Sequence, residues 1–317
     1  MKLLRIVPDD TKFGFMRFRR ISFPFSAVLS VLSVVLFLTM GMNFGIDFRG
    51  GTLVELHAKS GVADLAKVRQ TLEGMKLGDV EVQGFGNAAD ASLRVGLQEG
   101  GGTAQTAVVD KVKAALEGQY TFPRVDVVGP RVSAELVQSG TIGIVVSVAT
   151  VLFYLWFRFE WQFAVGAVIA TLHDLVLTIG FFSLTRLEFD MTSIAAILTI
   201  VGYSLNDTVV VLDRIREMMR KYKKMSISDM LNISINTTLS RTIMTSLATF
   251  LALVALVGFG GHVIRSFSLA MMFGVVIGTY SSIFIAAPVL IYLGVRTEAF
   301  SGAKSEPEPA KPAKAVA

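Results

Sequence analysis

Two acidic residues lie within long apolar segments, and they are the residues of this sequence most able to do chemistry. Asp207 follows Tyr203 and Ser204 in one segment, and Asp174 follows His173 in another. An ionised side chain at the centre of a helix in lipid costs about 2.5–3.5 kcal/mol on insertion scales, so it usually faces a partner or a water-filled path. The sequence therefore favours two carboxylates that titrate in a proton pathway. The alternative is a carboxylate fixed in a salt bridge that only holds helices together.

Arg241 is the basic residue best placed to act with Asp207. It begins a further apolar segment and shares a helical face with small hydroxyl residues, namely Ser234, Thr237, Thr238, Thr245 and Thr249. Small polar stripes face other helices rather than lipid. The two segments are consecutive and antiparallel, so Asp207 and Arg241 could meet at similar depth, and a small movement between them could change whether the acid holds a proton. An anchor at the membrane interface is the other interpretation of Arg241.

The sequence lacks the residues that several classes of enzyme need. It has no cysteine, which excludes a disulfide framework, a thiol nucleophile and a Cys-ligated metal. It also has no G-x-x-x-x-G-K-[ST] loop, no H-E-x-x-H motif and no His, Asp or Glu cluster with metal-ligand spacing. We therefore expect a protein that is not an enzyme and that uses no metal ion or organic cofactor. Acidic and basic residues nearly balance in residues 43–137, so nothing indicates nucleic-acid binding.

The composition indicates that the elements carrying these residues span a membrane. The chain has 317 residues, of which 52% are hydrophobic and only 17% charged, and its mean hydropathy is +0.59. A spanning helix needs about 20 mostly apolar residues. Six stretches reach or nearly reach that length, at about 21–42, 138–157, 162–184, 191–212, 239–258 and 267–293. Each should be a helix, because a segment in lipid must satisfy its own backbone hydrogen bonds, and the alternation of barrel strands is missing.

The positions of Lys and Arg predict the orientation of these spans. Basic residues gather before the first span, between the fourth and fifth spans, and in the tail, so the positive-inside rule places both termini in the cytoplasm. The first span should be uncleaved, because no A-x-A cleavage site follows it. The predicted parts are a cytoplasmic N-terminus (1–20), a first transmembrane helix (21–42), an outer domain (43–137), a five-helix transmembrane bundle (138–295) with a basic cytoplasmic loop (213–238), and a disordered cytoplasmic tail (296–317).

Residues 43–137 have the composition and periodicity of an α+β domain. Alternating stretches predict strands, and helical-period stretches predict helices, in the order 52–58 (strand), 62–75 (helix), 80–85 (strand), 92–97 (strand), 103–117 (helix) and 122–128 (strand). This β-α-β-β-α-β order is that of the ferredoxin-like fold. The predicted fold class is a polytopic α-helical membrane protein with six transmembrane helices and one extracytoplasmic ferredoxin-like domain between helices 1 and 2.

Several segments together resemble the SecD/SecF family of protein-export membrane proteins, which belongs to the RND superfamily. Residues 45–51, read as Gly45-Ile46-Asp47-Phe48-Arg49-Gly50-Gly51, are similar to the G-x-D-F-x-G-G signature of that family. Residues 202–217, with Gly202, Asn206 and Asp213, resemble its fourth-span motif, and residues 128–136, 239–242 and 278–284 resemble the entry to the second span, the fifth-span motif and the sixth-span motif. The small outer domain and the fourth-span sequence are of the SecF type.

The resemblance implies a multi-pass subunit of the bacterial inner membrane that forms a complex with SecD. Such a subunit works with the SecYEG channel, and it uses the proton-motive force instead of a cofactor to help move preproteins. The resemblance implies that Asp207 and Arg241 form a proton-relay pair, and Asp174 matches less sharply. Two other functions remain open: a proton-coupled secondary transporter of small solutes, which predicts an internal repeat or a self-dimer, and a passive assembly factor of the translocation channel, which would tolerate neutralisation of both Asp207 and Arg241.

Overall fold

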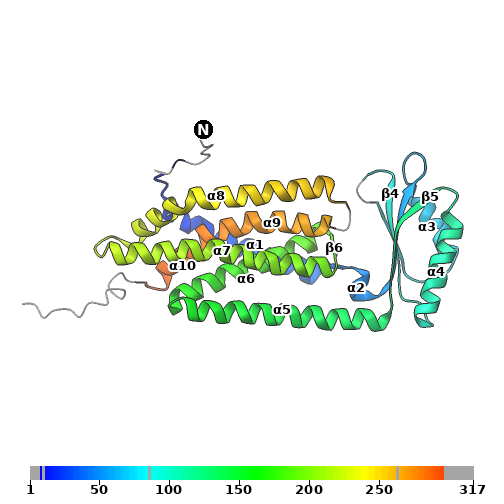
Figure 1. Cartoon of the computed structure of the whole chain (residues 1–317), viewed down its shortest axis with the longest axis horizontal. Coiled ribbons are helices and arrows are strands. Elements are labelled where there is room, and N and C mark those ends of the chain that lie inside the picture. The colour runs from blue at the N-terminus through cyan, green and yellow to red at the C-terminus, as the bar shows by residue number, and fades with distance from the viewer. Residues whose placement is uncertain (1–7, 9–10, 85–86, 262–263, 296–317) are drawn as a thin grey trace, which may run out of the picture.

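Two parts of the chain are visible in the computed structural model, a bundle of long helices and a smaller sheet domain at one end of it (Figure 1). The structure describes residues 8, 11–84, 87–261 and 264–295. The predicted tail 296–317 and most of the first ten residues lie outside the described residues.

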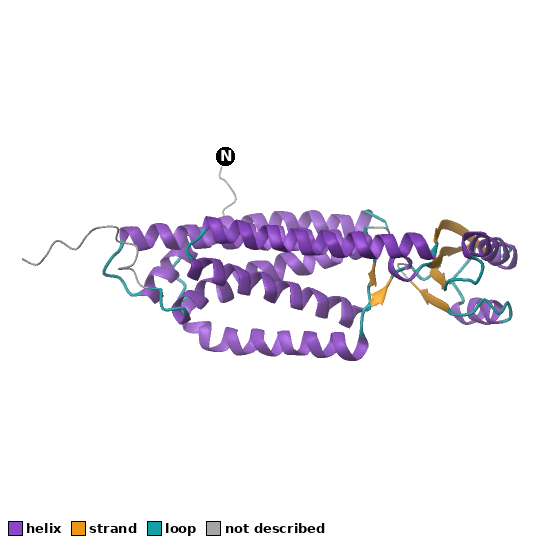
Figure 2. Cartoon of the chain, turned by 90° about the horizontal axis from the view of Figure 1, so that it is seen from below, coloured by secondary structure: helices purple, strands orange, loops and turns teal. Residues whose placement is uncertain are grey.

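Six helical segments in the described part of the chain are long and apolar enough to cross a membrane. They are α1 (Arg19–Met40), preceded by a 3-10 turn (Phe15–Phe18); α5 (Pro130–Arg158); α6 (Trp161–Thr185); α7 (Met191–Lys221); α8 (Ile227–Phe259); and α9 (Arg265–Ser281), continued by a π-helical turn (Ser282–Ala286) and α10 (Ala287–Tyr292). They run side by side along the long axis of the molecule (Figures 1 and 2). The prediction of a polytopic membrane protein with six apolar helices is confirmed.

The segment 213–238, predicted to be a basic loop, is helical except at 222–226. The cause is an apolar face that continues beyond the membrane-spanning run. Ile215 and Met219 on α7 and Met230 on α8 are all buried in one hydrophobic cluster. Because apolar residues keep the helical period while charged residues face outward, both helices extend past the apolar stretch and form a hairpin.

Helix α5 begins at Pro130, earlier than the start at 138 that hydropathy predicts. Gly129 is its N-cap, and Pro130 occupies the first turn, where a missing N–H and a fixed φ suit the start of a helix. The first turns of α5 are exposed, and Arg131 forms an ion pair there with Glu135 at 3.0 Å. The helix therefore continues without interruption from the end of the sheet domain to Arg158.

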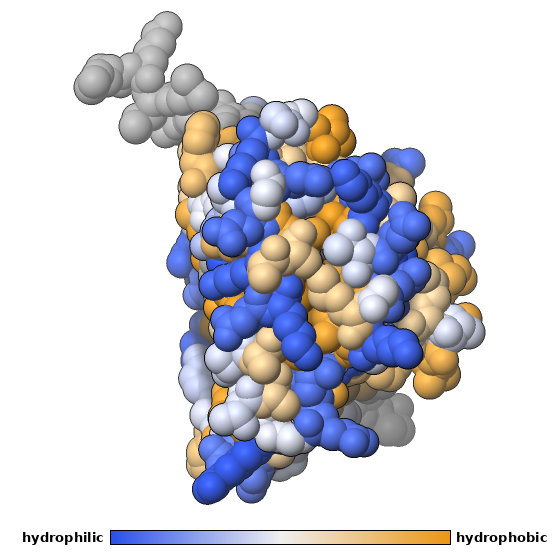
Figure 3. Space-filling view, turned by 90° about the vertical axis from the view of Figure 1, so that its right-hand side faces the viewer, coloured by the Kyte–Doolittle hydropathy of each residue, from blue (hydrophilic) through white to orange (hydrophobic). Residues whose placement is uncertain are grey.

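The sheet domain has the strand and helix order that the sequence predicts. Its elements are β2 (Gly51–Ala58), α3 (Leu65–Glu73), β3 (Val80–Gly84), β4 (Asp90–Val95), α4 (Gly101–Leu116) and β5 (Tyr120–Val128). The four strands form one sheet in the order β3-β4-β2-β5, and all neighbouring strands are antiparallel. Hydrophilic side chains are spread over the end of the molecule that this domain forms (Figure 3).

The two faces of this sheet have different neighbours. Val54 and Leu56 on β2 are buried in a cluster with residues of α3 and α4. Leu53 and Glu55, which alternate with them, face a cavity of about 420 Å³ between the sheet and the end of the membrane helices. The period-2 alternation of β2 therefore directs an apolar face to the two helices and a more polar face to the bundle.

Candidate proton-relay site

Helices α6, α7 and α9 form the centre of the bundle, because more than half of the spanning window of each is buried. Glycines on α9 allow its close approach to α7. A Cβ added at Gly274 would lie 2.3 Å from Ile200, and one added at Gly278 would lie 3.0 Å from the Cβ of Ser204. Small residues at helix contacts are typical of membrane bundles. This packing brings side chains of four helical segments to the two carboxylates.

Asp207 lies on α7 with only 8% of its surface exposed. Its Oδ1 accepts a hydrogen bond from the Thr242 hydroxyl of α8 at 2.6 Å, and its Oδ2 accepts one from the Ser282 hydroxyl at 2.6 Å. Ser282 begins the π-helical turn after α9. Both partners are hydroxyls, which can donate to a carboxylate and can also accept from a protonated acid. The site can therefore hold Asp207 in either protonation state without leaving a buried polar group unpaired.

Asp174 lies on α6 and is 1% exposed. Its Oδ2 accepts hydrogen bonds from the Ser204 hydroxyl of α7 at 2.5 Å and from the Ser281 hydroxyl of α9 at 2.7 Å. Its Oδ1 lies 3.0 Å from Nδ1 of His173. His173, the residue directly before Asp174, therefore has its ring against this carboxylate.

None of the ion pairs among the described residues joins Arg241 to Asp207. Arg241 is exposed on α8, while the next residue, Thr242, is buried and binds the Asp207 carboxylate. Successive residues of a helix point about 100° apart, so the face that carries Thr242 is the one turned toward α7. The Asp207 carboxylate makes its direct contacts with two hydroxyls, and its action together with Arg241 stays a prediction.

The sequence did not identify the hydroxyl partners of the two acids, which are Ser204, Thr242, Ser281 and Ser282. Ser204, named above because it shares a segment with Asp207, donates to Asp174 on a different helix. The predicted hydroxyl stripe on the fifth span does not include Thr242. Of that stripe, Ser234 and Thr238 are buried and donate to backbone carbonyls of their own helix. Two features of the sequence could have indicated these partners. Thr242 directly follows Arg241, and Ser281 and Ser282 are adjacent in the sixth span.

The 45–51 segment connects the sheet domain to the start of α7. Strand β1 (Asn43–Phe44) pairs in parallel with β6 (Glu188–Phe189), and α2 (Ile46–Arg49) follows. The Asp47 carboxylate accepts from the backbone N–H of Met191 at 3.0 Å, so it caps the first turn of the helix that carries Asp207. Phe48 packs against Phe44 and Phe189.

The three glycines of this segment lie where a side chain has no room. A Cβ added at Gly45 would be 2.8 Å from Oε1 of Glu188, and one at Gly50 would be 2.8 Å from a methyl carbon of Leu97. A Cβ added at Gly51 would be 2.4 Å from the carbonyl oxygen of Val95. The positions of the three glycines thus follow from close contacts of this segment with β6, just before α7, and with β4 and the residues that follow it.

Gly202, Asn206 and Asp213, also predicted as motif residues, lie along α7. Gly202 and Asn206 are exposed one turn apart on a membrane-spanning face. Asp213 accepts from Nη2 of Arg158 at the end of α5, at 2.5 Å. The three motif residues of α7 are part of the resemblance only, and the participation of Asp207, Asp174 and Arg241 in proton transfer stays a prediction.

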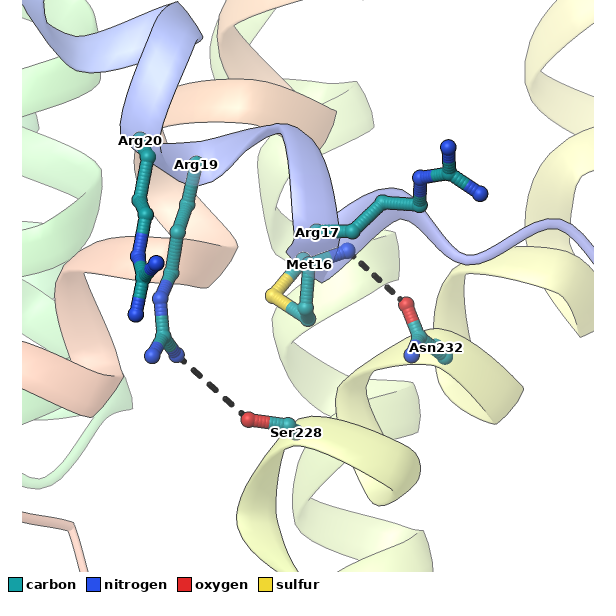
Figure 4. A pocket seen from close by; sticks show the side chains of 6 residues that line it. All are labelled: Met16, Arg17, Arg19, Arg20, Ser228 and Asn232. Carbon is teal, nitrogen blue, oxygen red and sulfur yellow. Dashed lines mark hydrogen bonds between the residues drawn. The ribbon is translucent and has the colours of Figure 1, made fainter.

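A cavity of about 370 Å³ lies between the start of α1 and the first turns of α8 (Figure 4), at the end of the bundle away from the sheet domain (Figure 1). Its lining consists of Met16, Arg17, Arg19, Arg20, Ser228 and Asn232. The N–H of Met16 donates to the Asn232 side chain at 3.0 Å, and Arg19 donates to the Ser228 hydroxyl at 3.4 Å. The segment before α1 is therefore held on the first turns of α8, and Arg17, Arg19 and Arg20 gather at one end of the molecule.

Six apolar helices, two carboxylates buried among them and a sheet domain at one end define a polytopic membrane protein with ionisable groups in its core. The family model described as protein export membrane protein SecD/SecF, C-terminal, matches residues 108–296, and the model described as SecD/SecF GG motif matches residues 35–62. This chain belongs to the SecD/SecF family of protein-export membrane proteins.

Curated relatives support the same assignment over most of the chain. The protein translocase subunit SecF of Cereibacter sphaeroides is 47% identical, and the match covers 92% of this chain and 93% of that protein. SecF of Rickettsia bellii is 45% identical over 90% of this chain and 95% of that protein. The protein translocase subunit SecDF of Brucella abortus is 45% identical, but the match covers 39% of that longer protein. The relatives are thus protein translocase subunits, as the resemblance predicted.

A crystal structure of SecDF from Thermus thermophilus, described as a translocon-associated membrane protein, has a similar fold. The two superpose with a TM-score of 0.81 at 33% sequence identity, covering 90% of this chain and 39% of that one. A second SecDF structure, in a form described as super-membrane-facing, gives a TM-score of 0.66 at 35% identity. This chain therefore corresponds to about two fifths of the solved SecDF chains.

Proposed function

We propose that this chain is a SecF-type subunit that forms a complex with SecD and couples the proton-motive force to preprotein translocation through SecYEG. One observation carries the proposal: Asp207 is buried within the spanning helices and is held by hydroxyls of two other segments. A carboxylate needed only for helix association would gain most from a fixed cationic partner. Hydroxyl partners are compatible with both the charged and the neutral acid, as a proton-carrying group requires.

The energy available from one proton is sufficient to change the packing of such a bundle. Moving one charge through 100 mV releases about 2.3 kcal/mol, which changes a two-state equilibrium by roughly fifty-fold at about 1.4 kcal/mol per decade. We propose that titration of Asp207, with Arg241 nearby on α8 and Asp174 as a second acid, switches the helices between two arrangements. No catalytic residue and no cofactor enters this mechanism.

The need for a partner is supported by polar residues that the single chain leaves exposed. Asn206 on α7 and Arg241 on α8 are exposed within spanning helices, where an uncovered polar group is unfavourable in lipid. We propose that SecD covers these faces. The SecDF relatives, of which this chain matches about two fifths, support an association of the two parts.

We further propose that the protein lies in the bacterial inner membrane with both termini in the cytoplasm. The arginines around the cavity in Figure 4 lie at one end of the bundle, and the sheet domain lies at the other end. The positive-inside rule assigns the arginine-rich end to the cytoplasm. The sheet domain is then periplasmic, and its strand order β3-β4-β2-β5 supports its assignment as a ferredoxin-like domain.

The test is the replacement Asp207→Asn in a strain that lacks the wild-type copy. We expect the variant to assemble with SecD, because an amide preserves the size of the side chain, and to lose export that depends on the proton gradient. Asp110→Asn is the control, since Asp110 is an exposed acid on α4. Unchanged gradient-dependent export in Asp207→Asn would rule out the proposal and favour a passive assembly factor.

A further inference from the structure

Asp174 and Asp207 lie on different helices, yet two consecutive residues bind them. The Ser281 hydroxyl donates to Oδ2 of Asp174 at 2.7 Å, and the Ser282 hydroxyl donates to Oδ2 of Asp207 at 2.6 Å. Both serines are fully buried. A single peptide unit therefore joins the hydrogen-bonding partners of the two acids.

The backbone at this peptide is unusual. Helix α9 ends at Ser281, and the π-helical turn Ser282–Ala286 follows before α10. Such wide turns are rare within helices and occur often at functional sites. The turn is held between two helices: Gly278, just before it, packs against Ser204 of α7, and a Cβ added at Gly166 of α6 would lie 3.1 Å from the carbonyl oxygen of Ala286. A change in the backbone conformation of this turn would thus alter its packing against both helices that carry the acids.

Each serine hydroxyl also has a second acceptor one turn earlier. The Ser281 Oγ lies 3.1 Å from the carbonyl oxygen of Gly278, and the Ser282 Oγ lies 3.0 Å from that of Thr279. A hydroxyl has one proton to donate and two lone pairs that accept. It can donate to a carboxylate, or it can accept from a protonated acid while donating to the backbone carbonyl. Both arrangements leave no buried donor unpaired, so the hydroxyl proton can change direction at little energetic cost.

We infer that Ser281 and Ser282 are positioning residues that couple the protonation of Asp174 to that of Asp207. The inference rests on the proposed function, in which Asp207 gains and loses a proton. When Asp174 takes up a proton, the Ser281 hydroxyl turns to donate to the Gly278 carbonyl. The peptide between the two serines then shifts, and this shift moves the Ser282 hydroxyl that donates to Asp207. Because coupling between two binding sites is reciprocal, a proton on Asp207 affects Asp174 by the same factor.

Other ionisable groups lie near the two acids and are part of the same equilibrium. His173 contacts Asp174 through Nδ1, and its ring lies 6.1 Å from the ring of Tyr280 on α9. On the Asp207 side, Arg241 directly precedes Thr242 on α8, and Tyr203 of α7 donates to Ser246 of α8 at 3.1 Å. The experiment therefore compares variants that keep all these groups and change only the serine hydroxyls.

The experiment measures the pH dependence of carbodiimide labelling at Asp207, in the SecD complex in native membranes, by mass spectrometry of the labelled peptide. Carbodiimides modify protonated carboxyls in apolar surroundings. We expect Asp174→Asn to move the labelling midpoint of Asp207 by about one pH unit, which is a tenfold change in proton affinity and within the usual range of coupling between sites. In the background of Ser281→Ala with Ser282→Ala, we expect Asp174→Asn to leave that midpoint unchanged.

Two further variants separate the effect from a general loss of structure. Ser281→Thr with Ser282→Thr keeps both hydroxyls and should retain the one-unit shift. Ser268→Ala removes another buried hydroxyl of α9, one that donates to the Ile264 carbonyl and to neither acid, and it should also retain the shift.

The possible failures are distinguishable. If labelling at Asp207 titrates but the effect of Asp174→Asn is absent in the wild type, or persists without the serine hydroxyls, the coupling inference is wrong and the proposed function stands. If labelling at Asp207 does not depend on pH at all, the proposed function is wrong and the inference falls with it.

Discussion

Gly51 has a φ of +120°, a backbone conformation that residues with a side chain rarely adopt. It also packs so closely on β4 that a Cβ there would lie 2.4 Å from the Val95 carbonyl oxygen. The backbone angle and the contact independently require glycine. Gly51 begins β2, the strand that pairs with both β4 and β5, so a displaced backbone at this residue would disturb the centre of the sheet.

We expect Gly51→Ala to destabilise the sheet domain by at least about 1–3 kcal/mol, since a strained backbone angle alone costs that much. Thermal unfolding of the purified protein in detergent, with hydrogen exchange to locate the loss in β2, measures the effect. Gly143→Ala on α5 is the control, because a Cβ there meets nothing within 4 Å and alanine favours helix. Equal stability of Gly51→Ala and the wild type would contradict the role given to this glycine.

A residue of the site was predictable where its own segment of sequence is sufficient to indicate it. A carboxylate within an apolar run is such a case, and both Asp174 and Asp207 are buried as expected. Their partners were not predictable, because Ser281 is 107 residues from Asp174 and Ser282 is 75 residues from Asp207 along the chain. The rotation of α8 decides that Thr242, and not Arg241, meets Asp207, and hydropathy does not determine that rotation.

The contact between β4 and β6 is the main polar link from the sheet domain to the bundle. Arg94 on β4 donates to Asn43 and to the Phe44 carbonyl, each at 3.1 Å, and pairs with Glu188 on β6 at 3.0 Å. Burial raises the pKa of Glu188 above its usual range, although the Arg94 guanidinium opposes the shift. The buried position is therefore the dominant influence on this carboxyl.

The raised pKa of Glu188 predicts the sign of a pH effect on stability. The folded chain binds this proton more tightly than the unfolded chain, so the contribution of Glu188 to stability is present below its ordinary pKa of about 4.3 and is lost as pH rises through the raised value. We expect Glu188→Gln to remove this loss, giving a melting temperature that falls less with rising pH across the mildly acidic range.

Melting temperatures in detergent from pH 4 to pH 7 measure this difference. Glu81→Gln is the matched control, because Glu81 contacts the same arginine at 3.4 Å but its side chain is 47% exposed, against 29% for Glu188. A wild-type protein that gains stability relative to Glu188→Gln as pH rises would show that the ion pair with Arg94, and not burial, dominates at this position.

At the level of elements, hydropathy predicts which segments are helices but not where the helices end. The apolar runs identify all six spanning helices of the described chain. Their ends are fixed by local chemistry that the hydropathy average does not contain: Pro130 begins α5 before the apolar run, and the amphipathic residues after Asp213 prolong α7. The short strands β1 and β6 were not predicted, since they exist only by pairing across 145 residues of sequence, as Asn43 does with Glu188.

At the level of the whole molecule, the spanning surface is not uniformly apolar. Most of the exposed residues on α1 and α5 are large and hydrophobic, as contact with lipid requires. Helix α7 differs, because Thr199, Gly202 and Asn206 form an exposed small or polar line at helical spacing. This face is suited to close packing with another helix and poorly suited to lipid.

We expect Gly202→Trp to reduce co-purification of SecD at least tenfold, because a large ring on this face would prevent close helix packing. A Cβ at Gly202 meets nothing within 4 Å in the single chain, so the fold of the subunit itself should tolerate the change. Val145→Trp on α5 is the control, since Val145 is 60% exposed on a helix with a hydrophobic outer face. Full recovery of SecD with Gly202→Trp would place the partner on another face.

The direct continuation of β5 into α5 has a mechanical consequence. Only Gly129 separates the last residue of β5 from a helix of 29 residues, which at 1.5 Å per residue is a rod about 44 Å long. We expect a tilt of the sheet domain to be passed along this rod to Arg158, which pairs with Asp213 of α7 at the far end of the bundle. Gly129, where a Cβ would meet nothing within 4 Å, is the one residue of this joint at which a movement of the sheet domain can be absorbed before it reaches the helix.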